Sequence, residues 1–450
     1  MTDNTASRAL TVGHDDYSLV RVPLSERRSW ISVAVQRFGQ VSSFQQFMVG
    51  AILGFGMTFR DAVLAITVGS VLLEVITILL GIAGVREGLS TSVLARWVGF
   101  GRRGSALVGM LVAISLAGWF GVQNGVFAQG MHDLTGWSSE WLWALLGGVA
   151  ITAVTTYGFR TMAWVGYLTV PAFLLLALIS IVDALRSHPL SELIASEPPG
   201  PALSLGAGLT LVSGAFILGA IMTPDMTRFN RRPSDVVKQT VLSVTLGEYV
   251  IGLIGVLLAH AARTDDVVGI VTSSSGLLGT LVLATAILKI NDWNLYSSSL
   301  GLVNSIHVLT GRRVGRVPVT VALGALGTLL SALGIVHAFA GFLTAVGMLA
   351  PPVAGIIIAE YYLVRTCRPV LENARLGNTL PPDPPDWAPR ALISWAAGTA
   401  AAVAGLGSAA LTSVAVAFVV HTVLGRLSAA RGARTAEPSA PVPATSTKGP

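Results

Sequence analysis

Four polar side chains interrupt an otherwise apolar stretch at residues 281–300, and their types suit the binding of a small molecule or an ion. They are Lys289, Asn291, Asp292 and Asn294. A lysine or an aspartate at the centre of a spanning helix costs roughly 2.5–3.5 kcal/mol on insertion scales, so such residues tend to face a cavity and a partner. The cluster is therefore expected to form one wall of a binding site.

The composition places these residues in a membrane. The chain has 450 residues, of which 52% are hydrophobic and only 12% are charged, whereas soluble domains carry about 25% charged residues. Its apolar stretches are long and continuous, which predicts spanning helices of about 20 residues rather than the short alternating segments of a β-barrel. We therefore predict an all-α polytopic membrane protein with twelve transmembrane helices in the lipid bilayer.

The positive charges indicate which side of the membrane the loops face. When the predicted loops are assigned to alternating sides, 24 of the 29 lysines and arginines fall on one side. The positive-inside rule makes that side cytoplasmic, with both termini inside and the protein in the inner (plasma) membrane of the cell. The net charge of +6 then reflects topology and does not indicate a nucleic-acid partner.

Two predicted spans are too rich in glycine and polar residues to be simple lipid-facing helices. The first, at about residues 29–57, contains Gly39, Ser42 and Ser43 in its first half, and the sixth, at about residues 203–223, contains four glycines. Interrupted helices at matching positions in two halves indicate a five-plus-five inverted-repeat transporter with broken helices 1 and 6. For the first span an alternative remains open, namely a weakly hydrophobic helix packed inside the bundle.

The chain divides into a transport core and flanking segments. We predict a disordered cytoplasmic N-terminal tail (1–27), a ten-helix transport core (28–365), a cytoplasmic proline-rich loop (366–389), two extra C-terminal helices (390–426) and a disordered cytoplasmic tail (427–450). The single Cys367 excludes an internal disulfide, and no cluster of metal ligands is visible. Neither a cofactor nor a metal is expected.

A second set of polar residues lies in the predicted third span, at about residues 106–130. Ser115, Trp119 and Gln123 are spaced four apart, so they share one helical face. This face presents an indole ring flanked by hydrogen-bonding groups. Such a combination suits a planar heterocycle, which is held by aromatic faces and by amide groups at its edge.

Five stretches, in this order along the chain, resemble a known family. They are GLSTSVLARWVGFG (88–101), GWFGV (118–122), SGAFILGAIMTPDMTRF (213–229), INDWNLYSSSLGL (290–302) and APPVAGIIIAEYY (350–362). Over roughly residues 30–365 the chain resembles the nucleobase:cation symporters, and within them the cytosine/purine permease branch. The resemblance implies twelve helices in the inverted-repeat fold, alternating access, and uptake of a flat nitrogenous base.

The resemblance also implies roles for individual residues. Trp119 matches the family's tryptophan that stacks on one face of the base, and Phe216 matches the aromatic residue that closes the other face. Gln123 matches a glutamine known from the related hydantoin permease. Asn291 and Asp292 match an Asn-Asp pair whose asparagine hydrogen-bonds the base in cytosine permeases.

Other positions of the implied substrate site agree less well with cytosine permeases. The main chain at Gly214 and Ala215 resembles the segment whose groups reach the edge of the base. However, Leu116 and Leu218 stand where the cytosine permeases have a glutamine and a serine. The loss of two hydrogen-bonding groups counts against cytosine itself, and Gln123 is a candidate to take over part of their role.

The implied ion site departs further from the family. Its sodium ligands would be carbonyls near Gly39, Ser42 and Ser43 and two adjacent hydroxyl residues, but those two positions are Lys289 and Ile290. An isoleucine offers no ligand, and an ammonium group repels a nearby sodium ion at low dielectric. We therefore expect the ammonium group of Lys289 to take the place of the ion and transport to be independent of sodium.

Three carboxylates are candidate partners for Lys289. Asp292 follows three residues later, while Glu74 and Glu248 lie within the second and seventh spans and could instead be neutral and hydrogen-bonded. If Lys289 gains and loses a proton during transport, the coupling ion is a proton. If its charge is fixed, the protein is an ion-independent facilitator.

Several function classes stay open at this stage. A monomeric secondary transporter of a nucleobase-like small molecule agrees with all of these observations. The alternatives are a facilitator or receptor for a hydantoin- or allantoin-type heterocycle without ion coupling, and a membrane enzyme. Catalysis needs a nucleophile–base set or metal ligands, and the histidines are scattered. The chain is therefore predicted not to be an enzyme.

Overall fold

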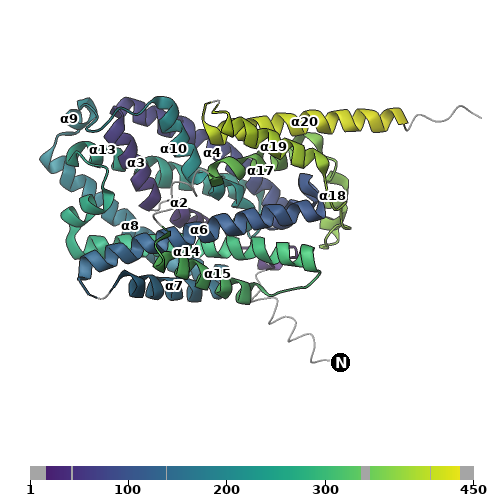
Figure 1. Cartoon of the computed structure of the whole chain (residues 1–450), viewed down its shortest axis with the longest axis horizontal. Coiled ribbons are helices and arrows are strands. Elements are labelled where there is room, and N and C mark those ends of the chain that lie inside the picture. Colours follow the sequence, from purple (N-terminus) through teal and green to yellow (C-terminus); the bar gives the residue numbers. More distant parts are fainter. Residues whose placement is uncertain (1–16, 42–43, 138, 336–344, 406, 436–450) are drawn as a thin grey trace, which may run out of the picture.

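The computed structural model describes residues 17–41, 44–137, 139–335, 345–405 and 407–435. Within these ranges the regular secondary structure is helical, apart from one isolated bridge between Arg28 and Asn230. Most of the long helices run along the long axis of the molecule (Figure 1). In chain order the elements are η1 (Leu24–Glu26), α2 (Trp30–Val41), α3 (Phe44–Gly56), α4 (Phe59–Glu87), α5 (Thr91–Leu94), η2 (Arg96–Phe100), α6 (Gly101–Thr135), α7 (Glu140–Thr156), α8 (Phe159–Ser187), α9 (Leu190–Ala195), α10 (Leu205–Ile221), α11 (Thr223–Thr227), α12 (Pro233–Ser243), η3 (Val244–Val250), α13 (Ile251–Ala262), α14 (Val267–Thr310), α15 (Arg316–Ala332), α17 (Pro351–Ile358), η5 (Ala359–Val364), α18 (Arg368–Leu376), α19 (Pro389–Val403) and α20 (Ala409–Thr435).

Several of these helices have the length and composition of membrane spans. In the described part of the chain, six are long and apolar enough to cross a membrane, and three shorter apolar helices accompany them. The six are Phe59–Glu87, Arg96–His132, Phe159–Ser187, Pro233–Ala262, Ala345–Val364 and Ala409–Ser428. The polytopic helical class is thus confirmed, while the number of twelve spans stays a prediction.

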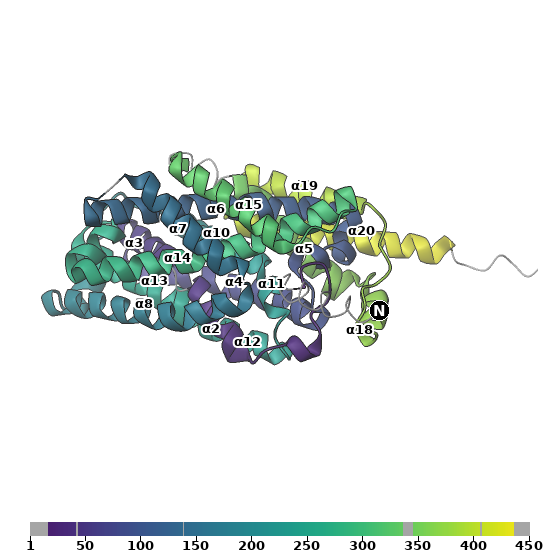
Figure 2. The same cartoon turned by 90° about the horizontal axis from the view of Figure 1, so that it is seen from below.

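The centre of the bundle is the pair α6 and α14, which lie side by side (Figure 1). Two glycines allow their backbones to touch. A Cβ atom on Gly109 would lie 2.4 Å from the carbonyl oxygen of Gly301, and a Cβ atom on Gly301 would lie 2.5 Å from that of Gly109. Small residues permit this close approach between membrane helices. α7 and α15 pack against the same pair (Figure 2).

The break expected in the first predicted span falls on residues that lie outside the described part of the chain. α2 ends at Val41 and α3 begins at Phe44, while Ser42 and Ser43 lie outside the described residues. Gly39 belongs to the last turn of α2. α3 then packs closely on α13, which places the two halves of this span against different neighbours.

The interruption of the sixth span lies elsewhere than predicted. α10 is continuous from Leu205 to Ile221, through all of its glycines, and the chain leaves the helix only at Met222. The five-residue helix α11 follows, with Pro224 in its first turn. Glycine permits a break but does not require one, and here the helical hydrogen bonds continue past Gly214.

Part of the predicted N-terminal tail is folded against the bundle. Residues 1–16 lie outside the described residues, but Val22 and Arg21 are buried. The Arg21 guanidinium forms an ion pair of 3.2 Å with the buried Glu87 at the end of α4. The structure therefore differs from the prediction for residues 17–27, because the charged side chains of this polar segment find buried partners that composition does not reveal.

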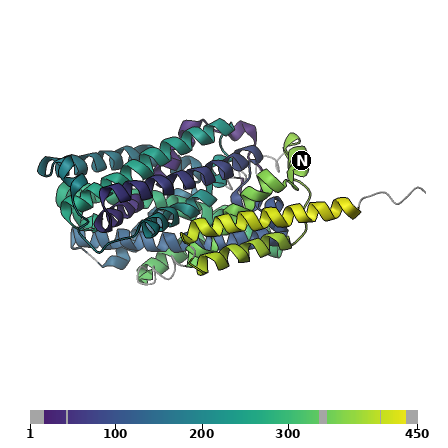
Figure 3. The same cartoon turned by 90° about the horizontal axis from the view of Figure 1, so that it is seen from above.

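The two C-terminal helices pack along one side of the bundle. α19 and α20 contact each other, and α20 lies along the outer surface (Figure 3). His421 of α20 approaches Glu360 of η5, with Nε2 and Oε2 3.0 Å apart, which fastens α20 to the core. α20 continues to Thr435, past the predicted boundary at residue 426, and α18 occupies part of the predicted loop 366–389.

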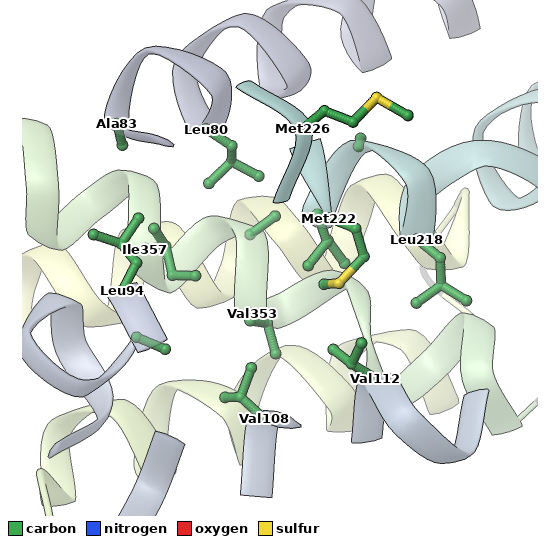
Figure 4. Close-up of a cluster of buried hydrophobic side chains, with 14 of the residues drawn as sticks. Leu80, Ala83, Leu94, Val108, Val112, Leu218, Met222, Met226, Val353 and Ile357 are labelled. Carbon is green, nitrogen blue, oxygen red and sulfur yellow. The ribbon is translucent and has the colours of Figure 1, made fainter. Parts of the chain in front are cut away.

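An apolar cluster joins several helices inside the bundle (Figure 4). Its members come from helices that are far apart in the sequence. They include Leu80 and Ala83 of α4, Leu94 of α5, Val108 and Val112 of α6, Leu218 of α10, Met226 of α11, and Val353 and Ile357 of α17. Leu218 of this cluster also lines the cavity described below.

Substituting Gly109 tests the contact between α6 and α14. Gly109→Ala should lower the free energy of unfolding by about 1–3 kcal/mol, the usual cost of overpacking, because the added methyl group meets a backbone carbonyl. Gly130→Ala on the same helix is the control, since no atom lies within 4 Å of its Cβ position. Thermal unfolding in detergent measures both variants. Equal stability would contradict close packing of α6 on α14.

Candidate functional site

A small cavity of about 30 Å³ lies where α3, α6, α10 and α14 meet. It is lined by Gln45, Leu116, Trp119, Gln123, Ala215, Phe216, Leu218, Gly219, Ile290, Trp293 and Asn294. Of the residues assigned to the substrate from the sequence, Trp119, Gln123, Ala215 and Phe216 all line this cavity. The structure thus brings together the residues of the third and sixth spans that were expected to hold a base.

A larger, mostly apolar cavity of about 500 Å³ adjoins the small one. The two share Gln45, Trp119, Gln123, Ala215, Leu218 and Ile290. Gly214 lines only the larger cavity, together with apolar residues such as Met48 and Val126. Ligand pockets have volumes of roughly 300–1,000 Å³, so the junction of the two cavities has room for a heterocycle.

The polar wall of the small cavity is a chain of amides. Nδ2 of Asn294 donates to Oε1 of Gln123 and to Oδ1 of Asn291, both at 3.1 Å. Nδ2 of Asn291 donates in turn to the main-chain carbonyl of Phe120 at 3.3 Å. Because this network orients the amide groups, the NH₂ group of Gln123 and the carbonyl oxygen of Asn294 are left for other partners.

The structure changes which asparagine faces the cavity. Asn291 is fully buried and does not line the cavity, whereas Asn294 does. Sequence reasoning assigned the base contact to Asn291 and named Asn294 only as part of the polar cluster, although the two lie three residues apart on one helical face. The rotation of α14 about its own axis decides between them, and packing against α6 sets that rotation.

Gln45 is a second site residue that the sequence analysis did not assign. Its Nε2 donates to the carbonyl oxygen of Ala215 at 2.8 Å, so it ties α3 to α10 and occupies the main-chain acceptor expected to face the base. A glutamine inside a predicted spanning helix could have marked Gln45 as a site residue. It did not single out Gln45, because several neighbouring residues of the first span are also polar.

The two leucines that replace hydrogen-bonding residues of the cytosine permeases also face the site. Leu116 and Leu218 both line the small cavity. Ile290, which replaces one implied hydroxyl residue of the ion site, lines it as well. The departures noted in the sequence are therefore concentrated at the cavity wall and make it more apolar.

Lys289 and Asp292 form a buried ion pair. Nζ lies 2.9 Å from Oδ1 and 2.8 Å from Oδ2, and both side chains are 2% exposed. Neither residue lines the cavities. The lysine stem passes between α8 and α2, because a Cβ atom on Gly166 would lie 3.1 Å from Lys289 Cε and 3.3 Å from Val35 Cγ1.

The carboxylate partner of Lys289 is thus Asp292, the nearest of the three candidates in the sequence. Glu74 lies on α4 and interacts electrostatically with Glu248 of η3, not at the lysine. Among the described residues no ion pair joins Glu74 to Lys289, and the place of Glu74 at the ion site stays a prediction. A spacing of three residues places a carboxylate beside a lysine on any helix, whereas long-range pairing depends on how the helices pack.

The chain is similar in sequence to known permeases. A family model described as permease for cytosine/purines, uracil, thiamine and allantoin matches residues 21–425. The cytosine permease of Escherichia coli (strain K12) is 30% identical over 352 residues, 78% of this chain and 82% of that protein. The hydantoin permease of Microbacterium maritypicum is 24% identical over 379 residues, 77% of this chain and 74% of that protein.

Solved structures support the same architecture. Mhp1, a nucleobase-cation-symport-1 family transporter in a closed conformation with bromovinylhydantoin bound, gives a TM-score of 0.76 at 18% identity and covers 92% of this chain and 96% of its own. A Na⁺-coupled sialic acid symporter gives a TM-score of 0.67 at 12% identity, covering 93% and 96%. These likenesses concern the fold, and they confirm the predicted transporter fold.

Removing one or both charges of the buried ion pair tests their interaction. Asp292→Asn leaves the ammonium group unpaired and should lower the free energy of unfolding by about 3–5 kcal/mol. Adding Lys289→Met should recover most of that loss, because no buried charge remains uncompensated. Arg368→Met in the exposed pair with Glu372 is the control, and it should cost about 0–1 kcal/mol. Additive losses at Lys289 and Asp292 would show that the two charges do not interact.

Proposed function

The chain belongs to the family of permeases for cytosine/purines, uracil, thiamine and allantoin, and from this premise we propose that it is a secondary transporter for a planar nucleobase or a related heterocycle. It takes up the base by alternating access as a monomer in the inner (plasma) membrane. The distribution of its lysines and arginines supports cytoplasmic termini. As a multi-pass permease, it is proposed to transport its substrate and not to act as an enzyme.

The observation that carries this proposal is the pairing of two aromatic residues with free amide groups at one cavity. Trp119 and Phe216 both line it and offer faces for a flat ring. The NH₂ group of Gln123 and the carbonyl oxygen of Asn294 supply one donor and one acceptor beside it. This pattern complements a ring edge that carries an acceptor next to an N–H group.

The identity of the heterocycle is constrained by what the cavity lacks. Leu116 and Leu218 give it an apolar wall where the cytosine permeases have hydrogen-bonding side chains. A site with fewer polar groups leaves part of the cytosine edge unpaired, which costs affinity. We therefore propose a heterocycle other than cytosine, whose edge toward Leu116 and Leu218 carries no hydrogen-bonding group, and the hydantoin permease match provides one precedent for a different ring.

The coupling ion is proposed from the Lys289–Asp292 pair. An ammonium group held by a buried carboxylate between α14, α2 and α8 replaces a cation that would bridge the same helices. Transport is then independent of sodium, and a proton on Lys289 is the coupling ion. A second candidate function is an ion-independent facilitator or receptor for a hydantoin- or allantoin-type heterocycle, which the contact of Lys289 with both carboxylate oxygens of Asp292 favours.

Substituting Trp119 tests the substrate site. A thermal-shift screen of the purified protein against purines, pyrimidines, hydantoins and allantoin first identifies the heterocycle that stabilises it. Trp119→Ala should then abolish saturable uptake of that compound while the protein stays folded in detergent, because one stacking face is lost. Trp164→Ala, at an exposed position of α8, is the control and should transport normally. Unchanged apparent affinity in Trp119→Ala would place the site elsewhere.

Replacing sodium with choline tests the coupling. Uptake should continue at the same rate without sodium and should respond to an imposed pH gradient. Lys289→Ala should lose gradient-driven accumulation yet keep exchange of substrate for substrate. A strict sodium requirement would contradict both versions of the proposal. Uptake that ignores both gradients would leave the ion-independent facilitator.

A further inference from the structure

Arg37 is a buried arginine that supports the cavity wall from behind. It lies in α2 and is 1% exposed. Its Nη1 donates to the carbonyl oxygen of Gly219 at 3.1 Å, its Nη2 donates to Oγ1 of Thr77 at 3.3 Å, and its guanidinium carbon lies 5.8 Å from the centroid of the Phe216 ring. Gly219 and Phe216 both line the small cavity, so a shift of this guanidinium changes the wall of the proposed base site.

Glu248 lies near Arg37 and Glu74 lies near Glu248, both away from the Lys289 pair. Glu248 in η3 is 2% exposed, and Glu74 on α4 is half-buried, one turn before Thr77. Glu248 is attracted by Arg37 and repelled by Glu74. Among the described residues, Oε1 of each glutamate is buried without a hydrogen-bond partner. Buried polar groups are nearly always satisfied, so unpartnered carboxylate oxygens call for a ligand.

The charges in this group do not balance. Of the elements packed against η3, α2 contributes Arg37 and α4 contributes Glu74. The nearest ionisable residues of α12 and α13, Lys238 and His260, are ten and twelve residues away from Glu248 along the chain. Two ionised glutamates facing one arginine leave a net negative charge inside an apolar bundle, which is costly. A single proton removes that charge.

We propose that Glu248 and Glu74 form a proton-binding site, separate from Lys289 and Asp292, and that Arg37 transmits its state of protonation to the substrate cavity. The ligand is a proton taken from the water phase, and no other atom or electron is exchanged. The site itself is independent of the proposed function. Only its effect on the base rests on that proposal.

The link between proton and substrate is a competition for one guanidinium. When both glutamates are ionised, Glu248 pulls Arg37 away from the Gly219 carbonyl and the Phe216 ring. When a proton is bound, this pull weakens and Arg37 holds the cavity wall as seen here. Binding of the base is therefore tighter in the protonated state, and by linkage a bound base favours binding of the proton.

Infrared difference spectroscopy of the ligand-free protein tests the proton site without any substrate. A buried carboxyl group that gains a proton as the pH falls gives a C=O stretching band in the difference between spectra at high and low pH. Glu248→Gln or Glu74→Gln should remove or shift this band. Glu192→Gln, at an exposed position in α9, should leave it unchanged. A spectrum of Glu248→Gln identical to that of the wild type would overturn the site.

The pH dependence of base affinity tests the role of Arg37. With the full-length protein and the base that stabilises it, affinity should fall as the pH rises, by at most about tenfold per pH unit for one linked proton. Glu248→Gln, which mimics the protonated form, should bind tightly with a flat pH profile. Arg37→Lys keeps the charge but cannot hold Gly219 and Thr77 together, so it should bind weakly at every pH.

Two outcomes of the affinity measurement would overturn the proposal that Arg37 transmits the protonation state of the glutamates to the cavity. One is a wild-type pH dependence that survives in Glu248→Gln and disappears in Lys289→Met, which assigns the proton to the other pair. The other is a wild-type affinity that does not change with pH. Absence of binding for every heterocycle would defeat the proposed function instead, and the infrared result would still decide the proton site.

Discussion

Close packing of α6 on α14 is the constraint on which the binding site depends. The helices touch through their backbones at Gly109 and Gly301, which leaves little freedom for either to slide or rotate. About three turns further along α6, the carbonyl group of Phe120 accepts a hydrogen bond from Asn291. That bond turns Asn291 away from the cavity and leaves Asn294 beside Gln123.

The same crossing explains why the site is both specific and small. Trp119 and Gln123 lie one turn apart on α6, and Asn294 meets them from α14, so these three side chains share a rigid frame. The remaining wall comes from α3 and α10. The cavity therefore joins the closely packed pair α6 and α14 to two further helices, of which α10 is continuous until Ile221.

Two groups of buried charges near the cavity differ in their balance of charge. Lys289 and Asp292 neutralise each other within a single helix, so the pair is self-contained. Arg37 instead interacts with Glu248, which in turn lies near Glu74, and it holds the carbonyl group of Gly219. The ion pair adds no net charge to the bundle, whereas the group around Arg37 carries a net negative charge when both glutamates are ionised. Low dielectric makes that difference large in a membrane.

The sequence by itself determined the membrane class and its helical character, and it predicted several residues that line the small cavity. Apolar length and loop charge depend on composition alone, and Trp119 and Gln123 share a cavity wall because they lie one turn apart on one helix, whereas Phe216 of α10 was implied by the family resemblance. The sequence also named Asp292 as the nearest of three candidate partners of Lys289, since residues three apart on a helix are neighbours. The tertiary structure decided what spacing cannot: which of Asn291 and Asn294 faces the cavity, where the sixth span breaks, that residues 17–27 are packed, and that Arg37 meets Glu248. Each of these depends on contacts between segments far apart in the chain, and such contacts follow from how helices rotate and pack against one another.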